Sequence, residues 1–414
     1  MTEDSRANYG VLTDEAFTRS RKRIGIPDRP LAPHNFEVTA DGTRHFAYGY
    51  GDANPLWCDP DYGKDTRWGS LIAPPNFIYT MGENVAPPLS PEQKQLMKGD
   101  PFAGLGSYQA VMEFEWFRPL RLGDRCRILR AQVGVQDKPS KFGGRTAHVT
   151  NDFLYANGAG EMVAVQRGTW INAERHTTKA NASTKAPVDV TTPYTDAQLA
   201  EIDAAYDAEV RRGSEPRYWE DVQIGDELQP RVKGPLTVTD VVVWHVGWGM
   251  QLTPPGAFGI SRQIRRKVPG LYPANQRNIP DTVQRLHWEP ERARELGLPM
   301  TYDYGAMRET WLTHLVTDWM GDDAWLWKLS CQHRKFNYIG DASWVRGRVT
   351  GKVESEAGHE VHLEVWVENQ RGETTTPGTA VVLLPTRDKT VSLPKPPADT
   401  LQSMLEYDIA RLAN

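Results

Sequence analysis

A short stretch near the N-terminus concentrates residue types that can do acid/base chemistry. Residues 46–75, FAYGYGDANPLWCDPDYGKDTRWGSLIAPP, place an acid, Asp52, and an amide, Asn54, among prolines that stop helices and before a closing Ala-Pro-Pro run. The segments on either side are apolar and belong in a core. Polar groups and turn residues inside an apolar frame are typical of a functional site rather than of packing. This stretch therefore predicts a site.

Length and charge limit the classes of protein to consider. The chain has 414 residues, 39% of them hydrophobic, which is enough for about two to three domains with their own cores. A net charge of −5 with scattered Lys and Arg provides no basic surface for nucleic acid or for an anionic membrane. The polar N-terminus, MTEDSRANYG, has no signal-peptide pattern, so we expect a cytoplasmic protein.

Metal and cofactor motifs are missing from the sequence. The three cysteines, Cys58, Cys126 and Cys331, show no C-x-x-C spacing, so neither a disulfide framework nor a zinc site is expected. The ten histidines include no H-E-x-x-H pattern, and no glycine-rich phosphate loop is present. We therefore predict no metal and no cofactor.

Hydrophobic periodicity predicts the elements that position the site. Four runs of alternating polarity, typical of strands, follow one another at 108–117, 125–136, 145–156 and 161–172. Ahead of them we expect a short helix within 11–27 capped by Thr13, a strand at 31–38 and an apolar helix beginning at 76–83. One helix wrapped by a mainly antiparallel sheet accounts for this order.

The second half of the chain repeats the first. Phe46-Ala-Tyr-Gly-Tyr-Gly51 matches Trp244-His-Val-Gly-Trp-Gly249, and Leu56-Trp-Cys-Asp-Pro60 matches Leu286-His-Trp-Glu-Pro290, with about 32 extra residues between these blocks in the second copy. Strands are expected again at 326–337, 342–354, 359–369 and 376–384, and helices at 195–212 and in the amphipathic tail at 397–414. The predicted parts are an N-terminal unit at 1–175, a linker and helix at 176–214, a C-terminal unit at 215–390 and a tail at 391–414.

The residues Tyr50-Gly-Asp-Ala-Asn-Pro-Leu56 resemble the signature of the MaoC-like acyl dehydratases, the family of the (R)-specific enoyl-CoA hydratases, or hydratase 2. In that signature G-D-x-N-P-L is followed by His, whereas this chain has Trp57. The N-terminal half is similar to the FAS1-like dehydratase type. The resemblance implies an α+β double hot-dog, in which each of two tandem units wraps a mainly antiparallel sheet around a central helix.

The resemblance also implies a mechanism. Family members hold one water between the Asp and His of the signature, and a backbone N–H at the start of the central helix polarises the thioester carbonyl. Here the pair is split, because Asp52 lies in the first copy and His287 in the second, where Met250 replaces the acid. We predict that His287 is the general acid or base, that Asp303 or a residue of the insertion supplies the carboxylate, and that the Gly305 N–H binds the oxyanion.

Each candidate has a structural alternative. Asp52 can cap a helix in a loop that has lost its catalytic partner, and His287 can be a surface histidine in a turn. His245 lies on an apolar helix, where a histidine satisfied by backbone groups is common. Asp303 can cap the helix that follows it. The remaining candidates, expected to contact substrate or to shape the turns, are Asn54, Trp57, His245, Tyr302, Tyr304 and Gly305.

The expected function is hydration or dehydration of an enoyl-CoA or 3-hydroxyacyl-CoA, with an acyl-CoA or acyl-carrier thioester as substrate. The insertion is compatible with a bulky acyl group, and its basic run at 262–267 is either a solvated face or a contact to coenzyme A phosphates. Many tryptophans near the predicted site suggest a broad aromatic cavity. Thioesterase, isomerase or cyclase chemistry, a noncatalytic subunit that binds acyl or polycyclic ligands, and assembly into a homo-oligomer all stay open.

Overall fold

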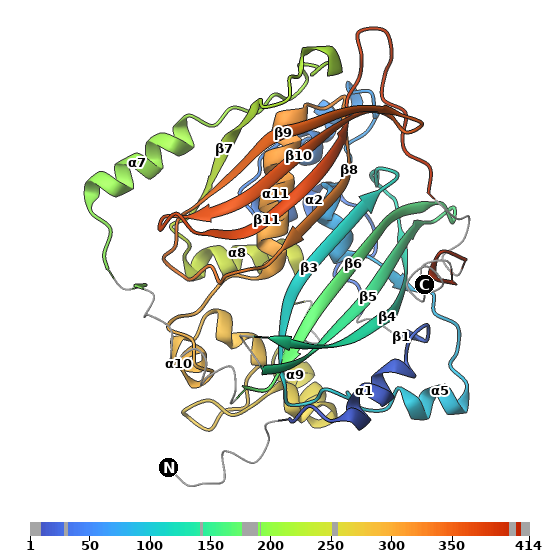
Figure 1. Ribbon diagram of the computed structural model, residues 1–414, viewed down its shortest axis with the longest axis vertical. Coiled ribbons are helices and arrows are strands. Elements are labelled where there is room, and N and C mark those ends of the chain that lie inside the picture. The colour runs from blue at the N-terminus through green and yellow to red at the C-terminus, as the bar shows by residue number, and fades with distance from the viewer. Residues whose placement is uncertain are drawn as a thin grey trace.

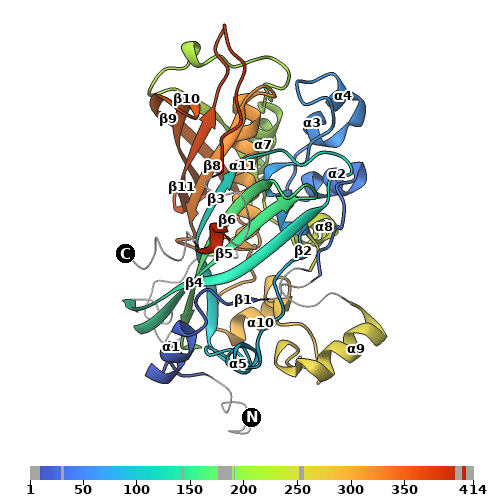
Figure 2. The same cartoon turned by 90° about the vertical axis from the view of Figure 1, so that its right-hand side faces the viewer.

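The computed structural model describes residues 10–28, 32–140, 144–175, 189–190, 192–250, 256–396 and 403–406. Its strands form one continuous sheet, and α11 lies against the strands of the C-terminal half (Figure 1). A view at right angles shows α2, α3, α4 and α8 together on one side of that sheet (Figure 2). In the part of the chain described here, no helix is both long enough and apolar enough to cross a membrane.

Two strand sets build the sheet. Within the described residues it has 11 strands, ordered β1-β4-β5-β6-β3-β8-β11-β10-β9-β7, with β2 paired to β4. The sets join where β3 runs antiparallel to β8, from Val111 opposite Gln332 to Glu115 opposite Lys328. The N-terminal strands are β1 (Pro27–Asp28), β2 (Glu83–Asn84), β3 (Gly106–Trp116), β4 (Cys126–Ser140), β5 (Gly144–Asn157) and β6 (Met162–Ala173). The C-terminal strands are β7 (Glu227–Lys233), β8 (Trp325–Gln332), β9 (Ser343–Ser355), β10 (Gly358–Asn369) and β11 (Thr374–Leu383).

Both predicted sets of four strands are confirmed, and with them the α+β class. The strand predicted at 31–38 is wrong over the described residues 32–38, which form no strand. Pro33 lies in this segment and has no N–H to donate to a neighbouring strand. The prediction also missed β7, which pairs with β9 at one edge of the sheet.

Threonine caps begin helices where the sequence predicts them. Thr13 accepts a hydrogen bond from the Ala16 N–H, and Thr195 forms a capping box with Gln198. The linker and the tail lie mostly outside the described residues, although residues 403–406 form one helical turn. The short helices are α1 (Asp14–Arg21), α2 (Ala40–Tyr48), α3 (Pro55–Cys58), α4 (Pro60–Lys64), α5 (Pro91–Leu96), α7 (Asp196–Asp207), η3 (Trp219–Asp221), α8 (Val238–Trp248), α9 (Phe258–Lys267), η4 (Pro269–Leu271), η5 (Val283–His287) and α10 (Pro290–Glu295).

The two copies meet along α2 and α8, the helices that carry the first block of the sequence repeat. An ideal Cβ on Gly247 would lie 2.3 Å from the Cα of Phe46, so glycine is required for this close crossing. The rings of Phe46 and Trp244, aligned as equivalents in the repeat, lie 5.6 Å apart between centroids. Equivalent residues thus meet across the contact between the copies, as an internal twofold relationship requires.

The copies differ most in their central helix. In the C-terminal half, α11 (Gly305–Met320) has 16 residues, and all but the first are buried. The apolar helix predicted from 76–83 is instead a six-residue 3-10 helix, η2 (Pro75–Thr80). The helix stops because Met81 is extended and Gly82 has a φ of 120°, with Ile128 2.8 Å from where a Cβ would lie. α11 therefore packs against η2 as well as against β7–β11.

Candidate active site

Asp52 lies in a buried loop between α2 and α3. Its carboxylate contacts polar groups through hydrogen bonds and an ion pair. Its carboxylate accepts from the Asn54 N–H at 2.8 Å, from the Trp57 indole N–H at 2.9 Å and from the Tyr50 hydroxyl at 3.2 Å. The Asn54 side chain in turn accepts from the Leu56 N–H and caps α3. Trp57 thus stands in for the signature histidine as a donor to Asp52.

An imidazole does reach Asp52, from the other half of the chain. His314 on α11 places its Nε2 3.6 Å from Asp52 and 3.0 Å from Asp318, and its Nδ1 2.8 Å from the Lys233 ammonium. Arg231 pairs with Asp318 at 2.8 Å. Asp52, His314 and Asp318 have the geometry of a metal-ligand set, but Lys233 and Arg231 already balance the two carboxylates. We regard the cluster as a buried ion-pair network that joins the halves.

His287 is buried at the start of α11 rather than exposed in a turn. Its Nδ1–H donates to the Tyr302 carbonyl at 2.8 Å, and its ring stacks on Tyr304 at 3.7 Å between centroids. Burial lowers the pKa of His287 to about 3, so the ring is neutral. The Tyr304 hydroxyl joins His245 Nε2, at 3.1 Å, to Gln284. Among the described residues, no carboxylate pairs with His287, so its catalytic role stays a prediction.

Asp303 does not supply that carboxylate in this structure. Its side chain is buried and lies 3.0 Å from the Arg308 guanidinium, while its contact to His287 is through the backbone. Burial raises the pKa of Asp303 to about 7, against the opposing effect of Arg308. Arg308 also donates to the Lys335 carbonyl and to the Thr376 hydroxyl. The Asp303–Arg308 pair therefore ties the first turn of α11 to the strands behind it.

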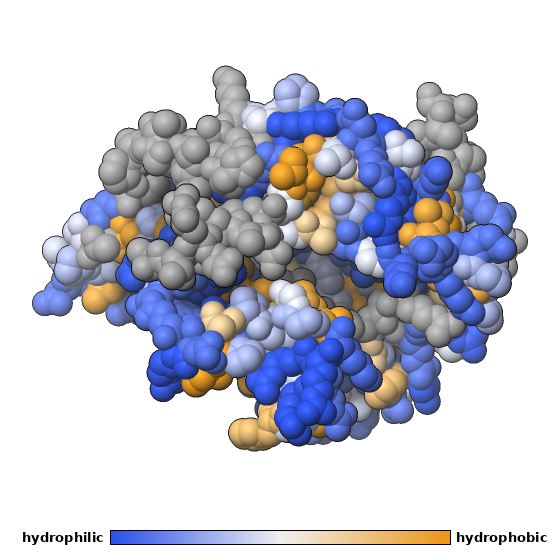
Figure 3. Space-filling model, turned by 90° about the horizontal axis from the view of Figure 1, so that it is seen from below, coloured by the Kyte–Doolittle hydropathy of each residue, from blue (hydrophilic) through white to orange (hydrophobic). Residues whose placement is uncertain are grey.

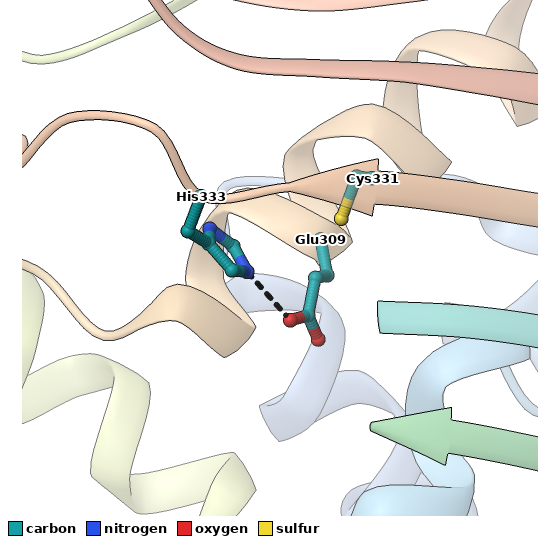
Figure 4. Close-up of side chains that lie close together, drawn as sticks. All are labelled: Glu309, Cys331 and His333. Atoms are coloured by element: carbon teal, nitrogen blue, oxygen red, sulfur yellow. Dashed lines mark hydrogen bonds and ion pairs between the residues drawn. The ribbon is translucent and has the colours of Figure 1, made fainter. Parts of the chain in front are cut away.

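A second acid and imidazole meet one turn further along α11. Glu309 is fully buried, and its Oε1 lies 3.0 Å from Nε2 of His333, the residue after β8 (Figure 4). Two donors from the N-terminal half hold the carboxyl group, because Gln109 Nε2 donates to Oε1 at 2.5 Å and the Tyr79 hydroxyl donates to Oε2. The Glu309–His333 dyad is therefore built from both halves of the chain.

The dyad lies beside the helix terminus that the sequence selected as an oxyanion site. An ideal Cβ on Gly305 would lie 2.5 Å from Gln109 Oε1 and 3.2 Å from His333 Nε2, so any larger residue would displace the Gln109 side chain. Amide N–H groups in the first turn of a helix have no partner within the helix and carry the positive end of its dipole. An acid, an imidazole and an amide donor thus converge near Gly305.

Burial sets the protonation states of the dyad. It raises the pKa of Glu309 well above its usual 4.5 and, together with the nearby Arg308 charge, lowers the pKa of His333 well below its usual 6.5. Burial therefore favours the protonated carboxyl group and the neutral imidazole, the forms that can donate and accept a proton. Nδ1 of His333 is buried and has no hydrogen-bond partner among the described residues.

Cys331 completes the group drawn in Figure 4 without adding chemistry of its own. Its sulfur lies within 4.8 Å of the Glu309 and His333 ligand atoms, a spacing that a metal site also uses. Burial raises the thiol pKa well above 9, and both oxygens of Glu309 already accept hydrogen bonds. Hydrogen bonding therefore accounts for the cluster.

The sequence interpretation did not select Glu309, His333, Gln109 or Tyr79. A usable signal was present in the sequence. Glu309 is an acid four residues after the proposed oxyanion glycine, in the same helix. Tyr302 and Tyr304 lie at the same helix start, where they contact His287. The basic run at 262–267 belongs to α9 and is largely exposed, as expected of a solvated face.

The walls of two cavities are formed by residues other than Gly305, Glu309 and His333. One is apolar, with a volume of about 30 Å³ and walls that include Trp57, Trp116 and Thr317, so it is narrower than the broad aromatic cavity expected. The other is polar, with a volume of about 320 Å³, and lies on the N-terminal half. Seen from below, the molecule is hollowed near its centre, and hydrophilic and hydrophobic residues both border the hollow (Figure 3).

Comparison with known proteins gives related sequences for part of the chain. A family model described as "FAS1-like, dehydratase domain region" matches residues 27–166. A UPF0336 protein of Streptomyces avermitilis is 32% identical over 108 residues, 25% of this chain and 65% of that protein. A UPF0336 protein of Thermobifida fusca is 30% identical over 137 residues, 32% of this chain and 80% of that protein. A probable enoyl-CoA hydratase alpha subunit of Thermomonospora curvata is 26% identical over 153 residues, 35% of this chain and 47% of that protein.

Solved structures match nearly the whole chain. A MaoC-like dehydratase superimposes with a TM-score of 0.59 at 17% identity, covering 88% of this chain and 99% of that one. A putative MaoC domain protein dehydratase from Chloroflexus aurantiacus superimposes with a TM-score of 0.51 at 11% identity, covering 87% of this chain and 96% of that one. Likeness at these identities concerns the fold, and the double hot-dog prediction is confirmed.

Proposed function

Because the chain belongs to the MaoC-like hot-dog dehydratases, with a FAS1-like dehydratase region in its N-terminal half, we propose that it hydrates or dehydrates an acyl thioester at the N-terminus of α11. The substrate would be a 2-enoyl or 3-hydroxyacyl group on coenzyme A or on an acyl carrier. A relative named as a probable enoyl-CoA hydratase subunit supports this substrate class. The catalytic groups we propose are Glu309, His333 and the Gly305 N–H.

In the dehydration direction, His333 takes the α proton of a 3-hydroxyacyl thioester, and the C–H electron pair forms the new double bond. The β C–O bond breaks, and Glu309 gives its proton to the departing hydroxyl, which leaves as water. Negative charge on the thioester oxygen during this step is stabilised by the Gly305 N–H and the dipole of α11. Proton transfer across the 3.0 Å Nε2–Oε1 contact returns both groups to their starting states. Hydration is the reverse.

One observation carries this proposal: a buried carboxyl group and a buried imidazole in contact, with pKa shifts of opposite direction. Proton donation and proton removal by positioned groups need a protonated acid and a neutral base at the same pH. The set predicted from the sequence lacks this property, because His287 contacts a carbonyl and Asp303 contacts Arg308. We therefore assign His287 and Asp303 to the support of the helix start, and Asp52 to the ion-pair network.

The experiment follows the ultraviolet absorbance of a panel of 2-enoyl-CoAs mixed with the purified protein, with free thiol measured in parallel. We expect the conjugated absorbance to fall without thiol release. Glu309→Gln and His333→Gln should slow the reaction by about 10²- to 10⁴-fold, the range for loss of a general acid or base, while His287→Asn keeps most of the rate. Thiol release would indicate a thioesterase instead. Full loss in His287→Asn with activity retained in Glu309→Gln would contradict the proposed site.

A further inference from the structure

The polar cavity lies between α1, residues 97–102 and the strands β3, β4, β5 and β6. Its volume of about 320 Å³ is within the range of small-molecule sites. Asp100 and Ser107 on its rim are exposed, so the cavity opens to solvent. We call it the polar cleft.

Several polar groups in the polar cleft are available to a ligand. Asp28 Oδ1 is buried and has no hydrogen-bond partner among the described residues, while Oδ2 pairs with Arg130 at 3.3 Å. The amide side chain of Asn151 and the hydroxyl of Ser107 also line the polar cleft, together with Asn172, whose Nδ2 already donates to the Ala147 carbonyl at 3.4 Å. A buried acceptor without a partner is costly, so a bound hydrogen-bond donor at Asp28 would be stabilising.

Two other polar residues of the polar cleft are already occupied. Arg23 donates to the carbonyls of Leu96 and Gly99, and Gln132 bonds to Ser20. These bonds attach α1 and residues 97–102 to the sheet, so the walls are fixed by contacts that a ligand need not replace. The groups left for recognition are neutral amides, a hydroxyl and one carboxylate–guanidinium pair.

Strand register connects the polar cleft to the catalytic dyad. Trp170, which lines the polar cleft, is the partner on β6 of Gln109 on β3. Side chains of such partners lie roughly 4.5–5.5 Å apart at Cβ. Gln109 holds the carboxyl group of Glu309 at 2.5 Å. The polar cleft therefore begins one strand pairing away from the reacting groups.

We propose that the polar cleft binds the pantetheine arm of the thioester substrate, the chain of two amides and one hydroxyl shared by coenzyme A and acyl carriers. This inference rests on the proposed function. The amide N–H groups and the hydroxyl of the arm can donate to Asp28 Oδ1, and the amide carbonyls of the arm can accept from Asn151. An alkyl chain in the same place would cover these polar groups without giving them partners.

The test measures binding and turnover with three substitutions. Asn151→Leu and Asp28→Asn alter the polar cleft, and Gln136→Leu, at an exposed position on β4 outside it, is the matched control. We expect both cleft variants to weaken the binding of free pantetheine, measured by calorimetry, by about tenfold, the size of one lost hydrogen bond, and the control to leave it unchanged. Thermal unfolding of each variant confirms that it folds.

Turnover measurements then show whether the polar cleft binds the arm or the acyl group. The KM of a 2-enoyl-pantetheine should rise about tenfold in the cleft variants with kcat unchanged, whereas a 2-enoyl thioester of N-acetylcysteamine, which lacks most of the arm, should be unaffected. An equal rise in KM for both substrates would place the acyl group in the polar cleft and overturn the proposal. An affinity for pantetheine that is unchanged by the cleft substitutions would overturn it as well. Comparison of coenzyme A with a loaded carrier protein distinguishes the two sources of the arm.

Failure of the proposed function gives a different pattern. In that case no enoyl thioester is turned over by the wild-type protein, while pantetheine binding still responds to the cleft substitutions. If turnover occurs but pantetheine does not bind to the wild-type protein, the inference about the polar cleft is wrong and the proposed function stands.

Discussion

Glu309 Oε1 and His333 Nε2 lie 3.0 Å apart although the two residues belong to different elements, α11 and the end of β8. Their surroundings come from the N-terminal half, which contributes Gln109 and Tyr79 as donors to the carboxyl group. The N-terminal half has only η2 in place of a central helix, and it takes part in the site through these two side chains. Both halves of the chain therefore contribute to the cluster around Glu309.

Gly305→Ala should lower kcat with little change in stability. The new Cβ would lie 2.5 Å from Gln109 Oε1, so the Gln109 amide must move away from Glu309. Loss of this hydrogen bond to the Glu309 carboxyl group should lower kcat about tenfold, the factor that corresponds to a hydrogen bond of about 1.4 kcal/mol. The matched control is Gly259→Ala in α9, where no atom lies within 4 Å of the added Cβ. Equal kcat values for the two variants would show that the approach to Gly305 is unimportant.

The dyad predicts a broad bell-shaped dependence of kcat/KM on pH. Activity needs His333 neutral and Glu309 protonated, so it falls on the acid side below the lowered pKa of His333 and on the alkaline side above the raised pKa of Glu309. The acid limb therefore lies below the usual 6.5 of histidine, and the alkaline limb lies well above the usual 4.5 of glutamate. A profile whose alkaline limb disappears in Glu309→Gln would agree with this assignment. An unchanged profile in that variant would contradict it.

Asp52→Asn should destabilise the protein and spare catalysis. The carboxylate accepts three hydrogen bonds and faces His314, so its replacement leaves buried donors poorly paired. We expect a loss of about 1–3 kcal/mol in the free energy of unfolding, measured in urea, with kcat within about threefold of wild type. Asp61→Asn, at an exposed position, is the control. A large fall in kcat at unchanged stability would return Asp52 to the catalytic site.

His287 should make the protein sensitive to acid. Its folded-state pKa, lowered to about 3, lies below the usual 6.5, so the unfolded chain binds the proton first. The contribution of His287 to the free energy of unfolding is fully present above pH 6.5 and is lost as the pH falls towards 3. Between pH 6.5 and 5 this amounts to about 2 kcal/mol of unfolding free energy. In urea titrations, the free energy of unfolding of His287→Asn should fall less between pH 6.5 and 5 than that of the wild-type protein, by the amount that His287 contributes. Identical pH dependence in both proteins would show that the ring titrates freely.

The sequence was sufficient for features set by local pattern. Alternating polarity located the strands, Thr13 marked a helix start, and the Phe46 and Trp244 blocks revealed the repeat, because each depends on residues close in the chain. The truncated central helix was not foreseen. It ends at Thr80, and the backbone path beyond it depends on the contact of Gly82 with Ile128 on β4, 46 residues away in the chain.

The sequence pointed to the helix start where we propose the site, but not to the two side chains that we propose act there. Gly305 and the start of α11 were identified from the motif, and the structure brings His287, Tyr302 and Tyr304 there as well. Glu309 and His333 were missed because their contact depends on the return of β8 beside α11 rather than on spacing along the chain. For the same reason, the pairing of Asp52 with His314 from the other copy had no sequence signal.

The most direct test of proton transfer through His333 is exchange of the α proton of a 3-hydroxyacyl-CoA in deuterated water, followed by NMR at neutral pH. The wild-type protein and His287→Asn should both incorporate deuterium at the α carbon, and His333→Gln should not. Incorporation that persists in His333→Gln, or that disappears in His287→Asn while the protein remains folded, would contradict the account.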